Sequence, residues 1–202
     1  MTRRIEFYFD VGSPTSYLAW RRLPKLAERF GASLEYKPVL LGGLFRAVEN
    51  RAPTEIAPKA AWFRQDVERC ARRDGIPFQW NPNFPVNTIL MMRAAAGLAG
   101  SSQFPRLLEA TFEGMWQDGL NMADDAVIDR QLEKHGLDTR MVREVAARAE
   151  TKAALKEQTE AAVARGVFGC PTMIVGDMLS FGQDRLIDVE EALATGMSSA
   201  AG

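Results

Sequence analysis

The chain has few cysteines and almost no histidine. Its 202 residues contain two cysteines, Cys70 and Cys170, far apart in the sequence, and one histidine, His135. No Cys-x-x-Cys motif and no Cys/His cluster occurs, which argues against a zinc site, and we expect no metal. Such sparse cysteine is typical of a reducing compartment, so we expect a cytoplasmic protein.

The sequence also lacks an excess of charge of either sign and any long apolar run. The formal net charge is −1 and the basic pairs are scattered, whereas a nucleic-acid-binding protein needs clustered Lys and Arg to neutralise phosphates. No apolar stretch approaches the roughly 20 residues of a transmembrane helix. Glu6 and Asp10 interrupt the first apolar stretch, which argues against a secretory signal. We therefore expect neither a nucleic-acid partner nor a membrane partner.

What the chain does contain is an ordinary globular composition, 47% hydrophobic and 25% charged, and a β-α-β pattern at its start. Residues 5–10 are short, apolar and aromatic, which predicts a buried strand. Residues 14–30 carry apolar side chains at helical spacing and precede Gly31, a typical helix end. Residues 33–41 predict a second strand, which we expect to pair in parallel with the first through a right-handed crossover.

The middle of the chain predicts helices and no strand from about residue 42 to 166. Residues 42–58 and 76–87 are rich in Gly and Pro and predict loops. Helices are predicted over 58–74, 88–100 and 105–116 from their apolar periodicity and from Pro105 in a first turn. Further helices are expected to begin at the N-cap residues Asp124, Asp138 and Thr151.

Strand character returns near the end of the chain. Residues 171–175 and 178–182 flank the turn Gly176-Asp177 and predict a β-hairpin, followed by a helix over 184–193. If both ends of the chain join one sheet, the helical block is an insertion into a thioredoxin-like α/β fold. We therefore expect a thioredoxin-like domain from residues 1–45 plus 166–202 and an inserted helical domain over 46–165.

Several short motifs together resemble one known family. They are FYFDVGSPTSYLA near the start, LLGGLF and NPNFPVNT in the middle, and GVFGCPTMIVG and FGQDRL near the end. In this order they resemble the glutathione-dependent 2-hydroxychromene-2-carboxylate isomerases, relatives of the kappa-class glutathione transferases and of the DsbA-type bacterial disulfide oxidases. The resemblance implies a thioredoxin-like fold with a large all-helical insertion, a homodimer, and glutathione as cofactor.

The resemblance draws attention to Ser13. In the redox relatives the first helix opens with Cys-x-x-Cys, whereas this chain has Ser13-Pro14-Thr15-Ser16, so it cannot run a dithiol cycle there. The family supplies the sulfur as glutathione. A thiolate beside Ser13 would gain the positive field of a helix N-terminus and a hydrogen bond, both of which lower its pKa from about 8.5. We predict Ser13 as the catalytic residue, a thiolate stabiliser; the alternative is a plain N-cap worth about 1 kcal/mol.

The loop around Cys170 and Pro171 resembles the cis-proline loop of thioredoxin-like folds. A cis bond before proline has a penalty of only about 0.5–1 kcal/mol. Cys170 is then expected to offer its backbone to the glutathione peptide, as an added strand would. The alternative is a trans Pro171 that begins an edge strand. We expect the Cys170 thiol to be a small buried filler, with a mixed disulfide as the less favoured role.

The resemblance also implies glutathione contacts at Asn50, Asp184 and Arg185. An aspartate suits the γ-glutamyl ammonium, and a helix N-terminus suits a carboxylate. Gln183 stands where relatives often have serine and is a weaker candidate, because an amide still donates and accepts. The alternatives are a turn residue for Asn50, a helix cap for Asp184 and a surface charge for Arg185.

The substrate is expected between the thioredoxin-like core and the helical insertion. We predict Lys37 to bind its carboxylate, with Lys59 and Arg64 as other candidates, and Trp62 to wall an aromatic pocket. Among the remaining residues, Phe168 is interpreted as core and His135 as an exposed residue at a helix end.

The resemblance implies a glutathione-dependent isomerase that interconverts 2-hydroxychromene-2-carboxylate and trans-o-hydroxybenzylidenepyruvate. The glutathione thiolate would add to the conjugated alkene, a bond would rotate, and the thiolate would leave. One alternative is a kappa-like glutathione transferase or peroxidase that acts on other electrophiles. The other is a non-catalytic binding module with a thioredoxin-like fold that has lost its cysteines.

Overall fold

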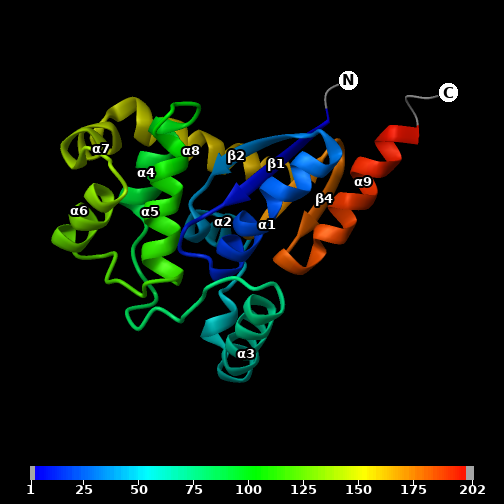
Figure 1. Cartoon of the computed structure of the whole chain (residues 1–202), viewed down its shortest axis with the longest axis horizontal. Helices are drawn as coiled ribbons and strands as arrows, with labels where there is room; N and C mark the ends of the chain where they lie inside the picture. Colours follow the sequence, from blue (N-terminus) through cyan, green and yellow to red (C-terminus); the bar gives the residue numbers. More distant parts are fainter. Residues whose placement is uncertain (1–2, 199–202) are drawn as a thin grey trace.

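The two ends of the chain do form one sheet. The computed structural model describes residues 3–198. Four strands, β1 (Arg4–Phe9), β2 (Ser33–Pro38), β3 (Thr172–Val175) and β4 (Met178–Phe181), lie in the order β2-β1-β3-β4 (Figure 1). β1 pairs with β2 in parallel and with β3 antiparallel, and β3–β4 is the predicted hairpin. The thioredoxin-like fold is thus confirmed, with β1 and β3 as the inner strands of the sheet.

Alternation along β1 divides the interior into two clusters. Ile5, Phe7 and Phe9 point into the larger hydrophobic cluster, because successive side chains of a strand face opposite sides of the sheet. Tyr8 belongs to a smaller cluster on the other face. Glu6 lies on the Tyr8 face and is 5% exposed.

Helix α1 (Pro14–Phe30) has the bounds that the sequence predicts. Ser13 is its N-cap, and Gly31, at φ 57°, ends it in the left-handed region that glycine adopts without steric cost. The predicted last helix is instead a short 3-10 turn, η2 (Gln183–Arg185), followed by α9 (Leu186–Ser198). Both α9 and η2 contact α1.

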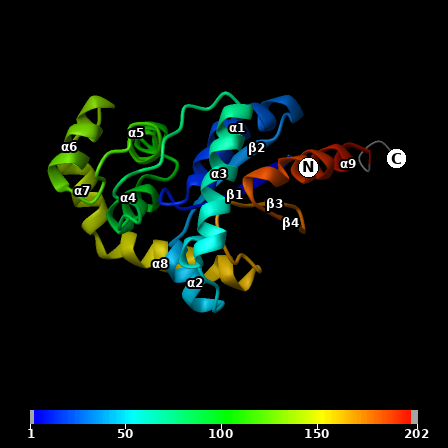
Figure 2. The same ribbon diagram turned by 90° about the horizontal axis from the view of Figure 1, so that it is seen from below.

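Between β2 and β3, residues 39–171, the chain forms helices and loops. The helices are α2 (Leu41–Ala47), η1 (Pro53–Glu55), α3 (Ala57–Arg73), α4 (Ile89–Leu98), α5 (Phe104–Trp116), α6 (Asp125–Lys134), α7 (Thr139–Ala147) and α8 (Ala149–Ala164). In Figure 1, α4 to α7 lie on one side of the sheet and α9 on the other, with α3 below. Viewed from below in Figure 2, α3 lies between these two groups.

The loop predicted over residues 42–58 is partly wrong, because α2 and η1 occupy most of it. Gly42 and Gly43, which suggested a loop, lie in a helix. A Cβ at Gly43 would lie 3.3 Å from Thr159 Cγ2 of α8. The absent side chain at position 43 therefore allows α2 to pack closely on α8.

The predicted N-cap roles of Asp124 and Asp138 are confirmed, whereas that of Thr151 is wrong. Both aspartates accept hydrogen bonds from the first backbone N–H groups of α6 and α7. Thr151 lies inside α8, whose N-cap is Arg148, and it is 4% exposed. Its hydroxyl packs against α4 at Gly97, so Thr151 is a packing residue.

One hydrophobic cluster joins the sheet to the helical segment. The Phe9 ring of β1 lies 5.8 Å from the Phe112 ring of α5, and Trp116 Nε1 donates a 2.7 Å hydrogen bond to the Val11 carbonyl. The domain boundaries near residues 45 and 166 stay a prediction. No helix within residues 3–198 has both the length and the apolar character of a bilayer span.

Candidate active site

A cavity of about 960 Å³ opens at the N-terminal end of α1. Segments distant in sequence border it, namely the turn at 12–15, the end of α2 and the loop after it, the first turns of α3, the loop at 168–170 and the segment at 181–184. Of the predicted site residues, the cavity brings together Ser13, Asn50, Trp62, Cys170 and Asp184. Its size falls in the range typical of small-molecule sites.

Ser13 caps α1 and also lines the cavity. Its Oγ accepts a hydrogen bond from the Ser16 N–H at 3.1 Å and donates to the Cys170 carbonyl oxygen at 3.1 Å. The Thr15 hydroxyl lies 3.0 Å from the Ser13 Oγ, and either hydroxyl can donate to the other. The Ser13 side chain is therefore both the cap of α1 and a polar group of the cavity.

The peptide bond between Cys170 and Pro171 is cis, as predicted. Cys170 borders the cavity, although the residue is only 7% exposed. Burial, followed by the charge of Asp10, raises the pKa of the Cys170 thiol well above its ordinary value. The thiol is thus held in its neutral form, which agrees with the predicted filler role. Pro171 is itself buried.

Asp10 is a buried carboxylate that the sequence reasoning did not single out. Its two oxygens accept hydrogen bonds from the N–H groups of Gly12 and Leu41, each at 2.9 Å. Burial raises the pKa of this carboxyl, and the two backbone hydrogen bonds oppose that rise. Asp10 joins the turn before α1 to the start of α2. An aspartate two residues before a glycine N–H is the turn signal that could have identified it.

Asn50 connects two of the loops that border the cavity. Its Nδ2 donates to the carbonyl oxygen of Phe168 at 3.0 Å. Phe168, interpreted from the sequence as core, is instead 39% exposed and packs on Phe181, with ring centroids 4.6 Å apart. The reason is local, because a Cβ at Gly169 would meet the Phe181 ring at 2.8 Å. The missing side chain admits the ring and leaves both phenylalanines at the cavity.

The segment after β4 brings Gln183 and Asp184 to the cavity but not Arg185. Asp184 is solvent-accessible, with a side chain 60% exposed, whereas Gln183 is 2% exposed. Arg185 is not part of the cavity lining, and its Nε lies 3.8 Å from Asp184 Oδ2. Gln183 and Asp184 therefore border the cavity, and a glutathione contact by Arg185 stays a prediction.

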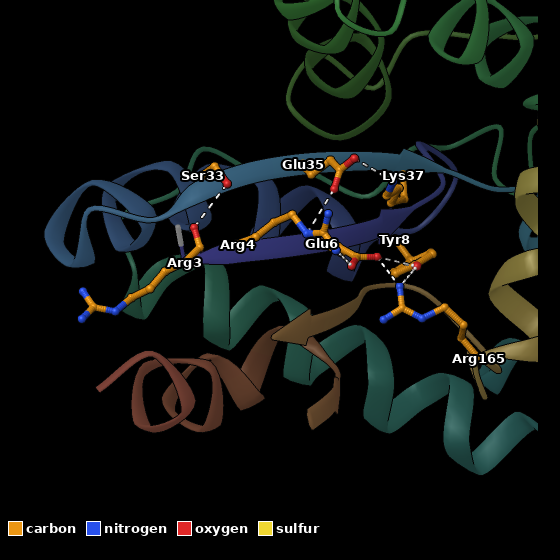
Figure 3. Close-up of polar contacts among 8 residues, drawn as sticks. All are labelled: Arg3, Arg4, Glu6, Tyr8, Ser33, Glu35, Lys37 and Arg165. Atoms are coloured by element: carbon orange, nitrogen blue, oxygen red, sulfur yellow. Dashed lines mark hydrogen bonds and ion pairs between the residues drawn. The ribbon is translucent and has the colours of Figure 1, made fainter. Parts of the chain in front are cut away.

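Lys37 does not reach the cavity, contrary to the prediction. Figure 3 shows it on the sheet face that carries Glu6 and Tyr8, where its Nζ pairs with Glu35 Oε1 at 2.8 Å. The nearby Glu6 carboxylate accepts hydrogen bonds from Tyr8 and Arg165. Lys37 therefore belongs to a polar cluster on the sheet.

Other cations and aromatic side chains line the cavity instead. Arg51 and Lys59 are the basic residues among them, and Trp62, 61% exposed, contributes an aromatic wall as predicted. Arg64 stacks on Trp80 and is not part of the lining. His135, expected to be exposed, has a side chain only 13% exposed, beside Glu113. Within residues 3–198, His, Cys, Asp and Glu form no group suited to a metal ion.

Comparison with known proteins gives a consistent result. A DSBA-like thioredoxin domain model matches residues 4–194. A 2-hydroxychromene-2-carboxylate isomerase of Sphingobium xenophagum is 34% identical over 96% of this chain and 99% of its own length. A glutathione S-transferase kappa 2 of Caenorhabditis elegans is 27% identical over 94% and 91%. The solved structure of a 2-hydroxychromene-2-carboxylate isomerase superposes with a TM-score of 0.87 at 30% identity, over 98% of both chains.

Proposed function

Because the chain belongs to the DSBA-like thioredoxin family and, within it, to the 2-hydroxychromene-2-carboxylate isomerases, we propose that it is a glutathione-dependent isomerase. It would interconvert 2-hydroxychromene-2-carboxylate and trans-o-hydroxybenzylidenepyruvate. One observation carries the proposal. The N-terminus of α1 opens into a large cavity with serine at positions 13 and 16, where a dithiol enzyme needs cysteine. Thiol chemistry at this helix end would then use a bound thiol.

The residues of the cavity fit glutathione, a tripeptide with two carboxylates and one ammonium group. Asp184 offers a carboxylate for the ammonium group, and Gln183 offers an amide beside it. Arg51 and Lys59 offer positive charge for carboxylates. The backbone of Cys170 lies next to Ser13, where an extended peptide would place its central residue. We propose Asn50 as a further contact from the facing loop.

Each part of the site has a task in this chemistry. Bound glutathione would supply the thiol nucleophile whose reversible addition permits rotation about the substrate's former double bond. The Ser13 hydroxyl and the positive field at the N-terminus of α1 would stabilise negative charge at the helix end. Arg51 or Lys59 would bind the substrate carboxylate, and Trp62 with Phe168 would hold its ring. The neutral Cys170 thiol takes no part.

An absorbance assay of the chromene with and without glutathione tests this proposal. We expect the spectrum to change only when glutathione is present. In Ser13→Ala the rate should fall by about 10²-fold or more, the usual effect of removing a donor to a developing anion, with glutathione binding retained. A protein that binds no glutathione at millimolar concentration would contradict the proposal and favour a non-catalytic binding module.

A kappa-like transferase is the second candidate. The kappa relative aligns over nearly the whole chain, and the cavity would admit electrophiles of other shapes. A protein that conjugates glutathione to a general electrophile, but leaves the chromene spectrum unchanged, would be such a transferase. A peroxidase would instead consume glutathione with a hydroperoxide.

We also propose a homodimer in the cytoplasm, as the resemblance implies. Light scattering coupled to size-exclusion chromatography tests the dimer, and cell fractionation tests the location. A monomer at micromolar concentration would contradict the first proposal.

A further inference from the structure

Arg22, in the middle of α1, makes contacts that the proposed chemistry does not use. Its Nη1 donates to the Gln183 carbonyl oxygen at 3.1 Å and to Gln183 Oε1 at 3.3 Å. The same atom pairs with Asp74 Oδ2 at 3.1 Å, at the C-terminal end of α3. One guanidinium group therefore joins α1, η2 and α3, three elements that contribute to the cavity or its support.

These contacts fix the orientation of the Gln183 amide. A guanidinium group can only donate hydrogen bonds, so the amide end that it meets must be Oε1. The other end, Nε2, is then left as a donor. Gln183 is 2% exposed and lines the cavity, so its amide cannot turn freely in solvent. Arg22 thus fixes Nε2 as the end of the Gln183 amide that can donate to a ligand.

The neighbouring side chain indicates what this donor meets. Asp184 follows Gln183 and also lines the cavity. An N–H donor beside a carboxylate matches the carboxylate and the ammonium group of an α-amino acid. In glutathione the γ-glutamyl residue is the only part with both groups.

We propose that Arg22 is a positioning residue, which orients the Gln183 amide so that Nε2 binds the γ-glutamyl carboxylate of glutathione. This inference rests on the proposed function. Arg22 itself touches no ligand. Its effect on binding passes through Gln183 alone. A carboxylate in place of the Gln183 amide must therefore also weaken glutathione binding.

The test is calorimetric measurement of the glutathione Kd for the full-length wild type and three variants. Arg22→Met should raise the Kd by about tenfold, because the amide loses its orienting hydrogen bond. Gln183→Glu keeps a partner for Arg22 but turns a carboxylate toward the ligand's carboxylate, and should raise the Kd by about 30-fold or more. Arg21→Met is the matched control, because Arg21 is similarly exposed on α1 but pairs with Glu113; its Kd should stay within about twofold.

Two further readouts separate positioning from a structural role. The thermal midpoint of Gln183→Glu should equal or exceed that of the wild type, since the new carboxylate pairs with Arg22. The loss of affinity should be the same for glutathione monoethyl ester, in which the glycyl carboxylate is blocked, because the γ-glutamyl end is intact.

Several outcomes would overturn the inference. If Gln183→Glu binds glutathione as the wild type does, or if its loss disappears with the ester, the amide does not meet the γ-glutamyl carboxylate. The Gln183→Glu result decides this point even if the Arg22→Met variant fails to fold. If Arg22→Met folds and binds normally, Arg22 positions nothing. If the wild type binds no glutathione at all, the proposed function fails together with this inference.

Discussion

Ser13 shows how one oxygen can serve both the fold and the chemistry. As N-cap it accepts from the Ser16 N–H, and its proton is directed to the Cys170 carbonyl. An anion at the helix end would compete for that proton with a neutral carbonyl, and a hydrogen bond to an ion is the stronger one. The cap need not break when the site acts, because its acceptor lone pair is separate from its donor proton.

Asp10 gives a prediction on pH dependence. Its carboxyl has a raised pKa in the folded protein because of burial, so the folded state binds its proton more tightly than the unfolded state does. The stability contributed by that proton is present below the unfolded pKa of about 3.9 and is lost as pH rises through the folded pKa. The free energy of unfolding of wild type minus that of Asp10→Asn should therefore fall as pH rises from about 4.

Urea denaturation of both proteins at several pH values measures this difference. The absolute stability of Asp10→Asn will be lower, because an amide cannot accept from both Gly12 and Leu41. The slope with pH is what tests the burial argument. A difference that is constant or rises with pH would contradict a raised pKa.

At the scale of elements, the glycines at position 42 of α2 and position 97 of α4 have opposite roles. A Cβ at Gly97 of α4 would lie 2.9 Å from Thr151 Oγ1 and would also meet Val145, whereas one at Gly42 of α2 would meet nothing within 4 Å. Gly97→Ala should therefore destabilise the protein by about 1–3 kcal/mol through overpacking. Gly42→Ala should stabilise it by about 0.5–1 kcal/mol through helix propensity.

Urea unfolding of the two variants measures both changes in the free energy of unfolding. The comparison is direct because the same substitution is made in both helices. Equal effects at the two positions would show that close packing of α4 on α7 and α8 does not determine the role of Gly97.

The helices and strands whose signals are local could be predicted from the sequence. Helix α1 has its cap, its periodicity and its closing glycine within its own residues, and it was found with its bounds. Helix α2 was missed because the packing role of Gly43 depends on Thr159, more than a hundred residues later. Thr151 was misassigned for the same reason, since a hydroxyl that packs against another helix looks like a cap in the sequence.

At the scale of the whole molecule, motifs identified the cavity's parts but not its boundary. Ser13, Cys170 and Asp184 each lie in a short motif, Asn50 follows another, and all four meet at one cavity. The basic residue of the substrate site was predicted at Lys37, which lies two residues after Glu35 and so on the same face of β2. Which lysine faces the cavity depends on how α3 sits against α1, and no local pattern encodes that.

The most direct test of the account is the pKa of the glutathione thiol when bound. Titration of the thiolate's ultraviolet absorbance in the wild-type complex measures it, with Ser13→Ala as reference. The account predicts a value below the usual one of about 8.5 in the wild type and a return toward that value in Ser13→Ala. A bound thiol that titrates at its ordinary value in the wild type would contradict the claim that Ser13 and the N-terminus of α1 stabilise the thiolate.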